Sequence, residues 1–346
     1  MNAPITLVIA LFLSATLTLG QGPLDSTPLR YSVKNLGASS IGITFSRDIN
    51  NSGQVIGITW GPSSYGKLYS KGRTTLLHPM AGQDASDVNA ISESGIVVGN
   101  SNVRILAGLK RTRACKWVDG KVQDLGMLSG DNISDAAGIN RSGVIVGTSG
   151  YFDINDSQNM RSRAVMWVNG KIQVLAGIKG ETSAAEDINT AGTILGMRNV
   201  RQPDSPPFLY RAGKAIDLAK PPGGRSFAAA LNDNGQVVGE GDVENNVSHA
   251  LLWSGGKVID LGTLPGQNQS SATNVNNHGE IVGSSGGGEK EHAFLWRKGH
   301  MYDLNDLISK GSGWVLEIAT SINDRGQIVG HGTCQGKQSA FLLTPQ

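Results

Sequence analysis

The sequence predicts an all-β fold, a seven-bladed β-propeller of four-stranded antiparallel blades, and three observations support it. First, a phrase that reads Ile-Asn-x-x-Gly, then an aliphatic run and a second Gly, recurs every 42 to 49 residues, a period typical of radial or stacked arrays. Second, glycine, at 47 of 346 residues, has about twice its usual share, which suits short strands joined by tight turns. Third, the two ends of the array complement each other. The Asn position of the phrase falls at Asn50, Ser92, Asn140, Asn189, Asn232, Asn276 and Asn323.

Each copy of the phrase predicts a β-hairpin, whose strands we name A and B. Asn suits the first position of a type I turn, where its side chain accepts a hydrogen bond from a backbone N–H two residues on, and Gly supplies the positive φ that follows. Aliphatic residues flank the turn on both arms, as in residues 48–57 and 90–99. Because the Asn and Asp recur at every turn, turn geometry explains them better than acid–base chemistry does.

A second phrase predicts two outer strands, C and D, in each repeat. Residues 113–117, 163–167, 249–253 and 292–296 place Ala three residues before Trp, and weaker copies end at Tyr69, Tyr210 and Leu343. The Asp119-Gly120 and Asn169-Gly170 pairs that follow two of these segments are strong hairpin signals. A four-stranded meander cannot bury both faces alone, so closure of seven such blades into a ring is the economical solution.

The ends of the chain predict how the ring closes. The last repeat stops at residues 339–343 with no strand D after it, whereas residues 31–36 look like a strand D without its C. The N-terminal strand should therefore pair with the C-terminal blade, which leaves no open sheet edge.

Several phrases resemble a known family. Residues 291–296 (Glu-His-Ala-Phe-Leu-Trp) and 257–266, with the Ile-Asn-x-x-Gly run, resemble the bacterial extracellular repeat family named HAF after its His-Ala-Phe tripeptide. The resemblance covers roughly residues 31 to 343, and only the sixth repeat has the literal tripeptide. It implies an exported, propeller-like protein and supplies no catalytic residues.

The N-terminus and the charge predict where the protein works. Residues 5–19 form an uncharged apolar stretch, which predicts a signal peptide over 1–20 and a single domain over 21–346. Because no Lys or Arg precedes the stretch, an uncleaved anchor stays possible as the alternative. We expect a secreted, cell-surface or periplasmic monomer whose mature chain does not span a membrane. The formal net charge of +2, with scattered Lys and Arg, argues against a nucleic-acid partner.

No metal or cofactor is predicted. Cys115 and Cys334 lie in repeats that are not neighbours, so a disulfide between them is not expected. His249 and His292 occupy a strand position where other repeats carry Arg, which favours an edge role. A run of oxygen ligands that would suit calcium lacks the Gly and distal Glu of known calcium loops, so a solvated turn is favoured. That run consists of Asp153, Asn155 and Asp156.

A ligand site is expected on the face that carries the B–C and D–A connections, because these segments vary in length, from about 284–290 up to about 148–162. Aromatic residues that break the repeat are the candidates, since exposed rings stack on sugars or grip a protein partner. The alternative is that they cap gaps between blades, the commoner role of such side chains. These candidates are Trp60, Tyr65, Tyr151, Phe152 and Trp314.

Two functions remain open from the sequence. The first is a secreted, non-enzymatic binding or cell-surface scaffold module for an extracellular glycan or protein. The second is a polysaccharide lyase or glycoside hydrolase on the same face, which would need ionisable residues from different blades to converge. The residues considered for that convergence are Asp153, Arg161, Glu240, Asp242 and His331.

Overall fold

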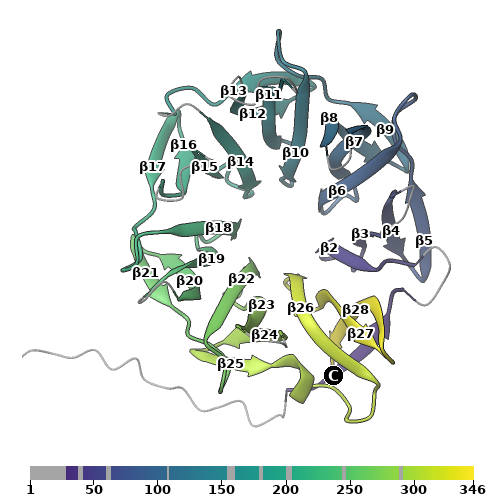
Figure 1. The fold of residues 1–346 in the computed structure, drawn as a ribbon, viewed down its shortest axis with the longest axis vertical. Coiled ribbons are helices and arrows are strands. Elements are labelled where there is room, and N and C mark those ends of the chain that lie inside the picture. Colours follow the sequence, from purple (N-terminus) through teal and green to yellow (C-terminus); the bar gives the residue numbers. More distant parts are fainter. Residues whose placement is uncertain are drawn as a thin grey trace, which may run out of the picture.

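The computed structural model confirms the predicted fold. It describes residues 29–37, 42–59, 64–106, 109–153, 160–178, 182–199, 205–243, 247–287 and 291–346. Seven four-stranded antiparallel sheets stand in a ring (Figure 1). Trp60 and the predicted signal peptide lie outside the described residues. No helix in the described part of the chain is long and apolar enough to cross a membrane.

Each of the first six blades takes its strands from one continuous stretch of chain, with strand A nearest the centre of the ring (Figure 1). Blade 1 consists of β2 (Phe45–Ile49), β3 (Val55–Ile58), β4 (Gly66–Ser70) and β5 (Arg73–Leu77). Blade 2 consists of β6 (Ala85–Ile91), β7 (Val97–Leu106), β8 (Leu109–Val118) and β9 (Lys121–Asp124). Blade 3 consists of β10 (Ile133–Ile139), β11 (Ile145–Tyr151), β12 (Arg161–Val168) and β13 (Lys171–Val174).

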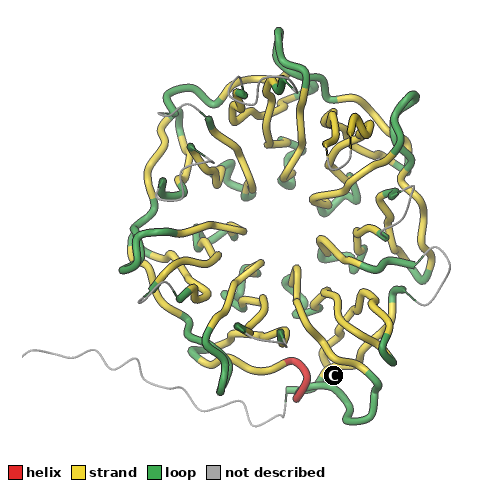
Figure 2. Tube along the Cα trace, viewed as in Figure 1, coloured by secondary structure: helices red, strands yellow, loops and turns green. Residues whose placement is uncertain are grey.

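The second half of the ring repeats the pattern. Blade 4 consists of β14 (Ser183–Ile188), β15 (Ile194–Arg198), β16 (Phe208–Arg211) and β17 (Lys214–Asp217). Blade 5 consists of β18 (Ser226–Leu231), β19 (Val237–Asp242), β20 (Ser248–Ser254) and β21 (Lys257–Asp260). Blade 6 consists of β22 (Gln269–Val275), β23 (Ile281–Gly286), β24 (His292–Arg297) and β25 (His300–Asp303). A 3₁₀ turn, η1 (Leu304–Asp306), follows and is the red segment in Figure 2.

Blade 7 joins the two ends of the chain, as predicted. It consists of β26 (Trp314–Ile322), β27 (Ile328–Cys334), β28 (Lys337–Pro345) and, as its strand D, β1 (Tyr31–Asn35). The register runs from Tyr31 opposite Pro345 to Asn35 opposite Phe341. Cys334 is the last residue of β27, and both cysteines are free.

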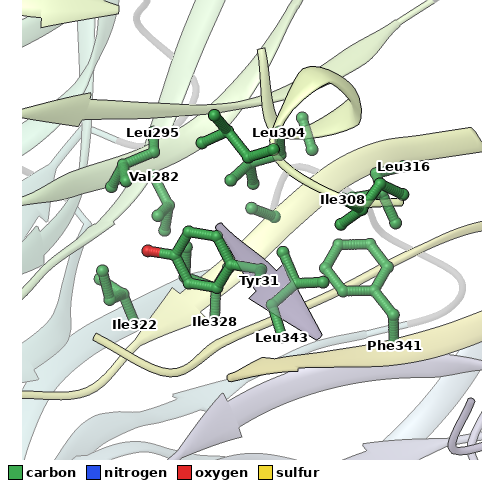
Figure 3. Close-up of a cluster of buried hydrophobic side chains, with 13 residues drawn as sticks. Tyr31, Val282, Leu295, Leu304, Ile308, Leu316, Ile322, Ile328, Phe341 and Leu343 are labelled. Carbon is green, nitrogen blue, oxygen red and sulfur yellow. The ribbon is translucent and has the colours of Figure 1, made fainter. Parts of the chain in front are cut away.

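Tyr31 anchors the closing strand in the core. Its ring lies among aliphatic side chains of blades 6 and 7, including Val282 and Leu343 (Figure 3), and its side chain is 4% exposed. Its backbone N–H donates to the carbonyl of Leu307 at 2.9 Å. Burial raises the pKa of Tyr31 to about 12. The strand is thus held by packing as well as by its ladder of hydrogen bonds.

The A–B turns have the predicted geometry. In blade 1 the Asn50 side-chain oxygen accepts from the backbone N–H of Ser52 at 3.1 Å and of Gln54 at 3.0 Å, and Gly53 has a φ of 74°. The side-chain amide also reaches the next blade, a role that sequence reasoning missed: Asn50 donates to the carbonyl of Ser92 at 3.0 Å. The same bond to the next blade recurs at Asn140, Asn189, Asn232, Asn276 and Asn323, the last across the seam.

A buried Ser at the start of strand A links most blades to the one before. Ser270 accepts from the backbone N–H of Ala250 at 2.8 Å and donates to the carbonyl of Gly262 at 2.6 Å. Ser226 is the exception, because its hydroxyl has no partner. The preceding blade carries Pro207 where blade 1 carries Gly66 and the other blades carry Ala, and proline has no N–H to donate.

Candidate functional site

The connections between strands divide the ring into two faces. The tight A–B and C–D turns share one face, which we call the turn face, and the B–C and D–A connections share the other, the loop face. In blade 2 the ten-residue strands β7 and β8 remain paired as far as Leu106 and Leu109 and extend the B–C hairpin. The sequence prediction had placed the longest B–C connection in blade 3 and missed this extension.

The four predicted aromatic residues in the described chain lie on the loop face and in three blades, with Tyr65 in blade 1, Tyr151 and Phe152 in blade 3 and Trp314 in blade 7. Tyr65 packs beside His78, with ring centroids 5.3 Å apart. Tyr151 lies beneath the guanidinium group of Arg161, 5.0 Å from the ring centroid. These contacts fit the alternative reading, in which aromatic side chains fill gaps.

The other two aromatic residues differ in how they are held. The backbone N–H of Phe152 donates to the side-chain oxygen of Asn132, and the Asn132 amide donates back to the carbonyl of Phe152, both at 2.9 Å. Trp314 packs edge-on against Phe341, with centroids 5.9 Å apart, and also lines a groove. Trp314 therefore borders a cavity that also contains polar groups.

That cavity, the 6–7 groove, lies between blades 6 and 7 and has a volume of about 700 Å³. It is built from the start of strands C and A and the ends of strands B and D, so it opens on the loop face. Its lining combines an apolar wall with two carboxylates. The lining residues are Glu291, His292, Asn305, Trp314, Val315, Glu317, Ile318 and Thr333.

A hydrogen-bond network fixes the floor of the 6–7 groove. His292 Nδ1 lies 2.6 Å from an Asp303 carboxylate oxygen, and the Asn305 backbone N–H donates to the same carboxylate at 2.8 Å. The Asn305 side chain then pairs with the backbone of Leu316, accepting from its N–H at 2.8 Å and donating to its carbonyl at 3.0 Å. This pairing occupies the backbone groups at the start of β26 and holds Trp314 and Val315 in place.

A β-bulge presents Glu317 to the groove. Every blade has one register shift at an equivalent place in its A–B ladder, which in blade 7 lies between Ala319 and Ser321. Blade 7 has a second shift, between Leu316 and Ile318, which makes Glu317 an extra residue. Bulges re-aim side chains and are frequent beside functional sites.

A second groove of about 820 Å³ lies between blades 5 and 6. It includes His249 and Asp260, whose side chains meet at 2.9 Å, and this pair occupies the same place as His292 and Asp303. Arg113 and Asp124 form the corresponding pair in blade 2, at 2.6 Å. In blades 2, 5 and 6 the His or Arg of strand C therefore pairs with the Asp of strand D, whereas Arg163 of blade 3 pairs with Asp131 instead.

The centre of the ring collects carboxylates on one side. Asp135 accepts from the amides of Asn89 at 3.0 Å and Asn100 at 3.2 Å. Burial, together with the nearby carboxylates of Asp87 and Glu186, raises the pKa of Asp135 to about 6 in spite of those hydrogen bonds. On the turn face, the centre holds a polar cavity of about 180 Å³, lined by the A–B turns.

The residues considered for catalysis do not converge. Arg161 pairs with Asp131 in blade 3 at 3.1 Å, and Asp242 pairs with Arg225 in blade 5 at 3.2 Å. His331 packs against Phe45, with ring centroids 5.0 Å apart. Asp153 and Glu240 lie in blades 3 and 5. Asn155 and Asp156, of the oxygen-ligand run, lie outside those ranges.

No group of three or more His, Cys, Asp or Glu side chains suited to a metal ion occurs in the part of the chain that the structure describes. The described carboxylates of the ring centre, Asp87, Asp135 and Glu186, are thus not arranged as a metal site. Asp131 accepts hydrogen bonds from Ser149, Arg163 and Arg161. Burial alone would raise the pKa of Asp131, but these hydrogen bonds lower it below the usual value.

Comparison with known proteins gives a fold and no activity. A family described as a protein of unknown function, DUF3466, matches residues 129–250, about a third of the chain. No curated protein matches. The HAF resemblance therefore stays a prediction.

Solved structures share the propeller fold at low identity. The propeller domain of the Trilobed protease from Pyrococcus furiosus is 10% identical, with a TM-score of 0.51, over 87% of this chain and 97% of that one. An acylaminoacyl peptidase from Pyrococcus horikoshii has a TM-score of 0.55, and a puromycin-hydrolyzing peptidase from Mycobacterium tuberculosis has 0.52. Both are 10% identical and are matched over 87% of this chain. The chain spans 52% of the length of each peptidase, so the likeness is one of fold alone.

Proposed function

We propose that the protein is an exported, non-enzymatic binding module that takes its ligand in the 6–7 groove. The observation that supports this most is the composition of the groove, in which Trp314 and the 44% exposed Val315 stand beside Glu291 and Glu317. Binding sites combine an apolar surface with a few polar groups held in place, and the Asp303 to Asn305 network holds this surface.

The alternative, a polysaccharide lyase or glycoside hydrolase, has less support. General acid–base catalysis needs ionisable groups within hydrogen-bond reach of one substrate position. The described candidates with ion pairs, Arg161 and Asp242, lie in different blades and are paired there with Asp131 and Arg225. Export rests on the apolar stretch before residue 20, and we propose a single domain over 21–346 that acts as a monomer.

The test is to screen the mature chain on glycan and peptide arrays and then measure the hits with Trp314→Ala. We expect this substitution to abolish binding, because it removes most of the apolar wall. Tyr151→Ala is the matched control, since it removes an aromatic side chain from the same face in blade 3. Trp314→Phe shows whether an aromatic ring is enough. Retained binding in Trp314→Ala, or turnover of a bound glycan, would refute the proposal.

A further inference from the structure

We infer that the ligand of the 6–7 groove is a cationic peptide segment in which Arg or Lys alternates with aliphatic residues. This inference rests on the proposed function and specifies its ligand. Three observations support it: the negative charge of the groove, the exposed apolar side chains that line it, and the bulge at Glu317.

Neither carboxylate of the groove forms an ion pair with a cationic side chain in the described ranges. Glu291 forms no ion pair within the described ranges, and the partner of Glu317 is the neutral amide of Gln338, at 3.0 Å. The protein as a whole has a formal net charge of +2, so this excess of carboxylate is local. Charge complementarity of this kind selects a cationic partner.

The nearest titratable groups do not supply the missing positive charge. His292 is already paired with Asp303 at 2.6 Å. His331, opposite Ile318 in the ladder, lies near enough to Glu317 to feel its charge. Burial nevertheless lowers the pKa of His331, and nearby Arg47 lowers it too, so the imidazole is neutral at physiological pH.

The apolar wall fits the aliphatic residues of such a segment and the stem of its basic side chain. Trp314 is half-buried and rests edge-on against Phe341, while Val315 is exposed. Cations bind the face of an indole ring, and long basic side chains lay their methylene stems on apolar surface. A neutral sugar would also stack on Trp314, but it would leave the carboxylates of Glu291 and Glu317 without a counter-charge.

Glu317 is specific to this groove. Six blades have one bulge in the A–B ladder and need no residue like it, so its presence in blade 7 is not demanded by the propeller. Because Glu317 comes between Leu316 and Ile318, the bulge places a carboxylate next to the apolar wall. This geometry places the carboxylate and the apolar wall within reach of one extended segment.

The experiment measures fluorescence anisotropy of labelled hexapeptides with the full mature protein. The probes are alternating Arg–Leu, alternating Gln–Leu and alternating Glu–Leu peptides, with unlabelled cellohexaose as competitor. We expect the Arg–Leu peptide to bind and the others to bind much more weakly or not at all. Its affinity should fall as salt increases, because exposed charges are screened.

Matched variants separate the two proposals. Glu291→Gln with Glu317→Gln should weaken Arg–Leu binding by up to about fivefold for each carboxylate removed, whereas Glu93→Gln on the turn face should leave it unchanged. Binding of Gln–Leu peptide or cellohexaose that Trp314→Ala abolishes and the Glu variants do not alter would overturn the cationic peptide and keep the binding module. Absence of any binding that depends on Trp314 would overturn both proposals.

Discussion

Removing one buried hydroxyl should have opposite consequences in two blades, because one hydroxyl has partners and the other has none. Ser270 is 5% exposed and joins the backbone N–H of Ala250 to the carbonyl of Gly262. Ser226 is 2% exposed at the equivalent place, but Pro207 leaves its hydroxyl without a donor. The proposed perturbation is the pair of variants Ser270→Ala and Ser226→Ala.

The magnitude follows from the groups left unpaired. Ser270→Ala orphans a buried N–H and a carbonyl, and each such group costs about 1–3 kcal/mol, so we expect a loss of about 2–3 kcal/mol. Ser226→Ala removes a hydroxyl that is itself unsatisfied, and should change the free energy of unfolding by less than about 0.5 kcal/mol or raise it. Both variants delete the same atom, so the difference between them isolates the hydrogen bonds.

Guanidinium unfolding followed by Trp fluorescence measures both values against the unaltered chain. Equal destabilisation of the two variants would refute this reasoning, because it would mean that loss of packing rather than of hydrogen bonds sets the cost. A Ser270→Ala variant as stable as the parent would do the same.

Three further predictions test closure, turn geometry and charge. Deletion of residues 29–37 should abolish cooperative thermal unfolding, because it removes β1 and Tyr31 from blade 7; a truncated chain that melts like the parent would contradict closure. Gly235→Val should cost about 1–2 kcal/mol in chemical unfolding, since Gly235 has a φ of 76° and an added Cβ meets nothing within 4 Å, so strain alone acts. The pKa of Asp135, raised from 3.8 to about 6, makes its contribution to stability decline as pH rises from about 4 to 6. Asp135→Asn should reduce that decline in unfolding measurements at pH 4.5 and 7, by up to about 2 kcal/mol; an unchanged pH profile would contradict the raised pKa.

The fold was predictable because its determinants are local and repeated. The Asn and Gly of each A–B turn are four residues or fewer apart, so their spacing in the sequence reflects the turn that forms, and Gly53 and Gly235 have the positive φ expected. The amide of Asn50, however, bonds to Ser92, 42 residues away. Contacts between blades leave no mark in the local sequence pattern. The hydrogen bonds from the turn Asn side chains to the next blade could therefore not be predicted.

The site was predictable only in part, for the same reason. Breaks in the repeat selected Trp314, which lines the 6–7 groove, but they also selected Tyr65 and Tyr151, which contact His78 and Arg161. Sequence reasoning had no means to tell a ring that fills a gap from one that borders a groove. Glu317 was missed because one inserted residue in strand A looks the same in sequence as ordinary variation in loop length.

The repeats within this chain act as controls for one another. A feature found in several blades, such as the Ser of strand A or the basic residue that pairs with Asp124, Asp260 or Asp303, is explained by the common fold. A feature found in one blade is not, because six other blades form without it. Glu317 is such a feature, and it lies beside Trp314 and Val315 in one groove. Trp314 also packs on the core of blade 7, but the common fold does not require the exposed Val315 or the inserted Glu317 beside it, and the proposed experiments test whether a ligand accounts for them.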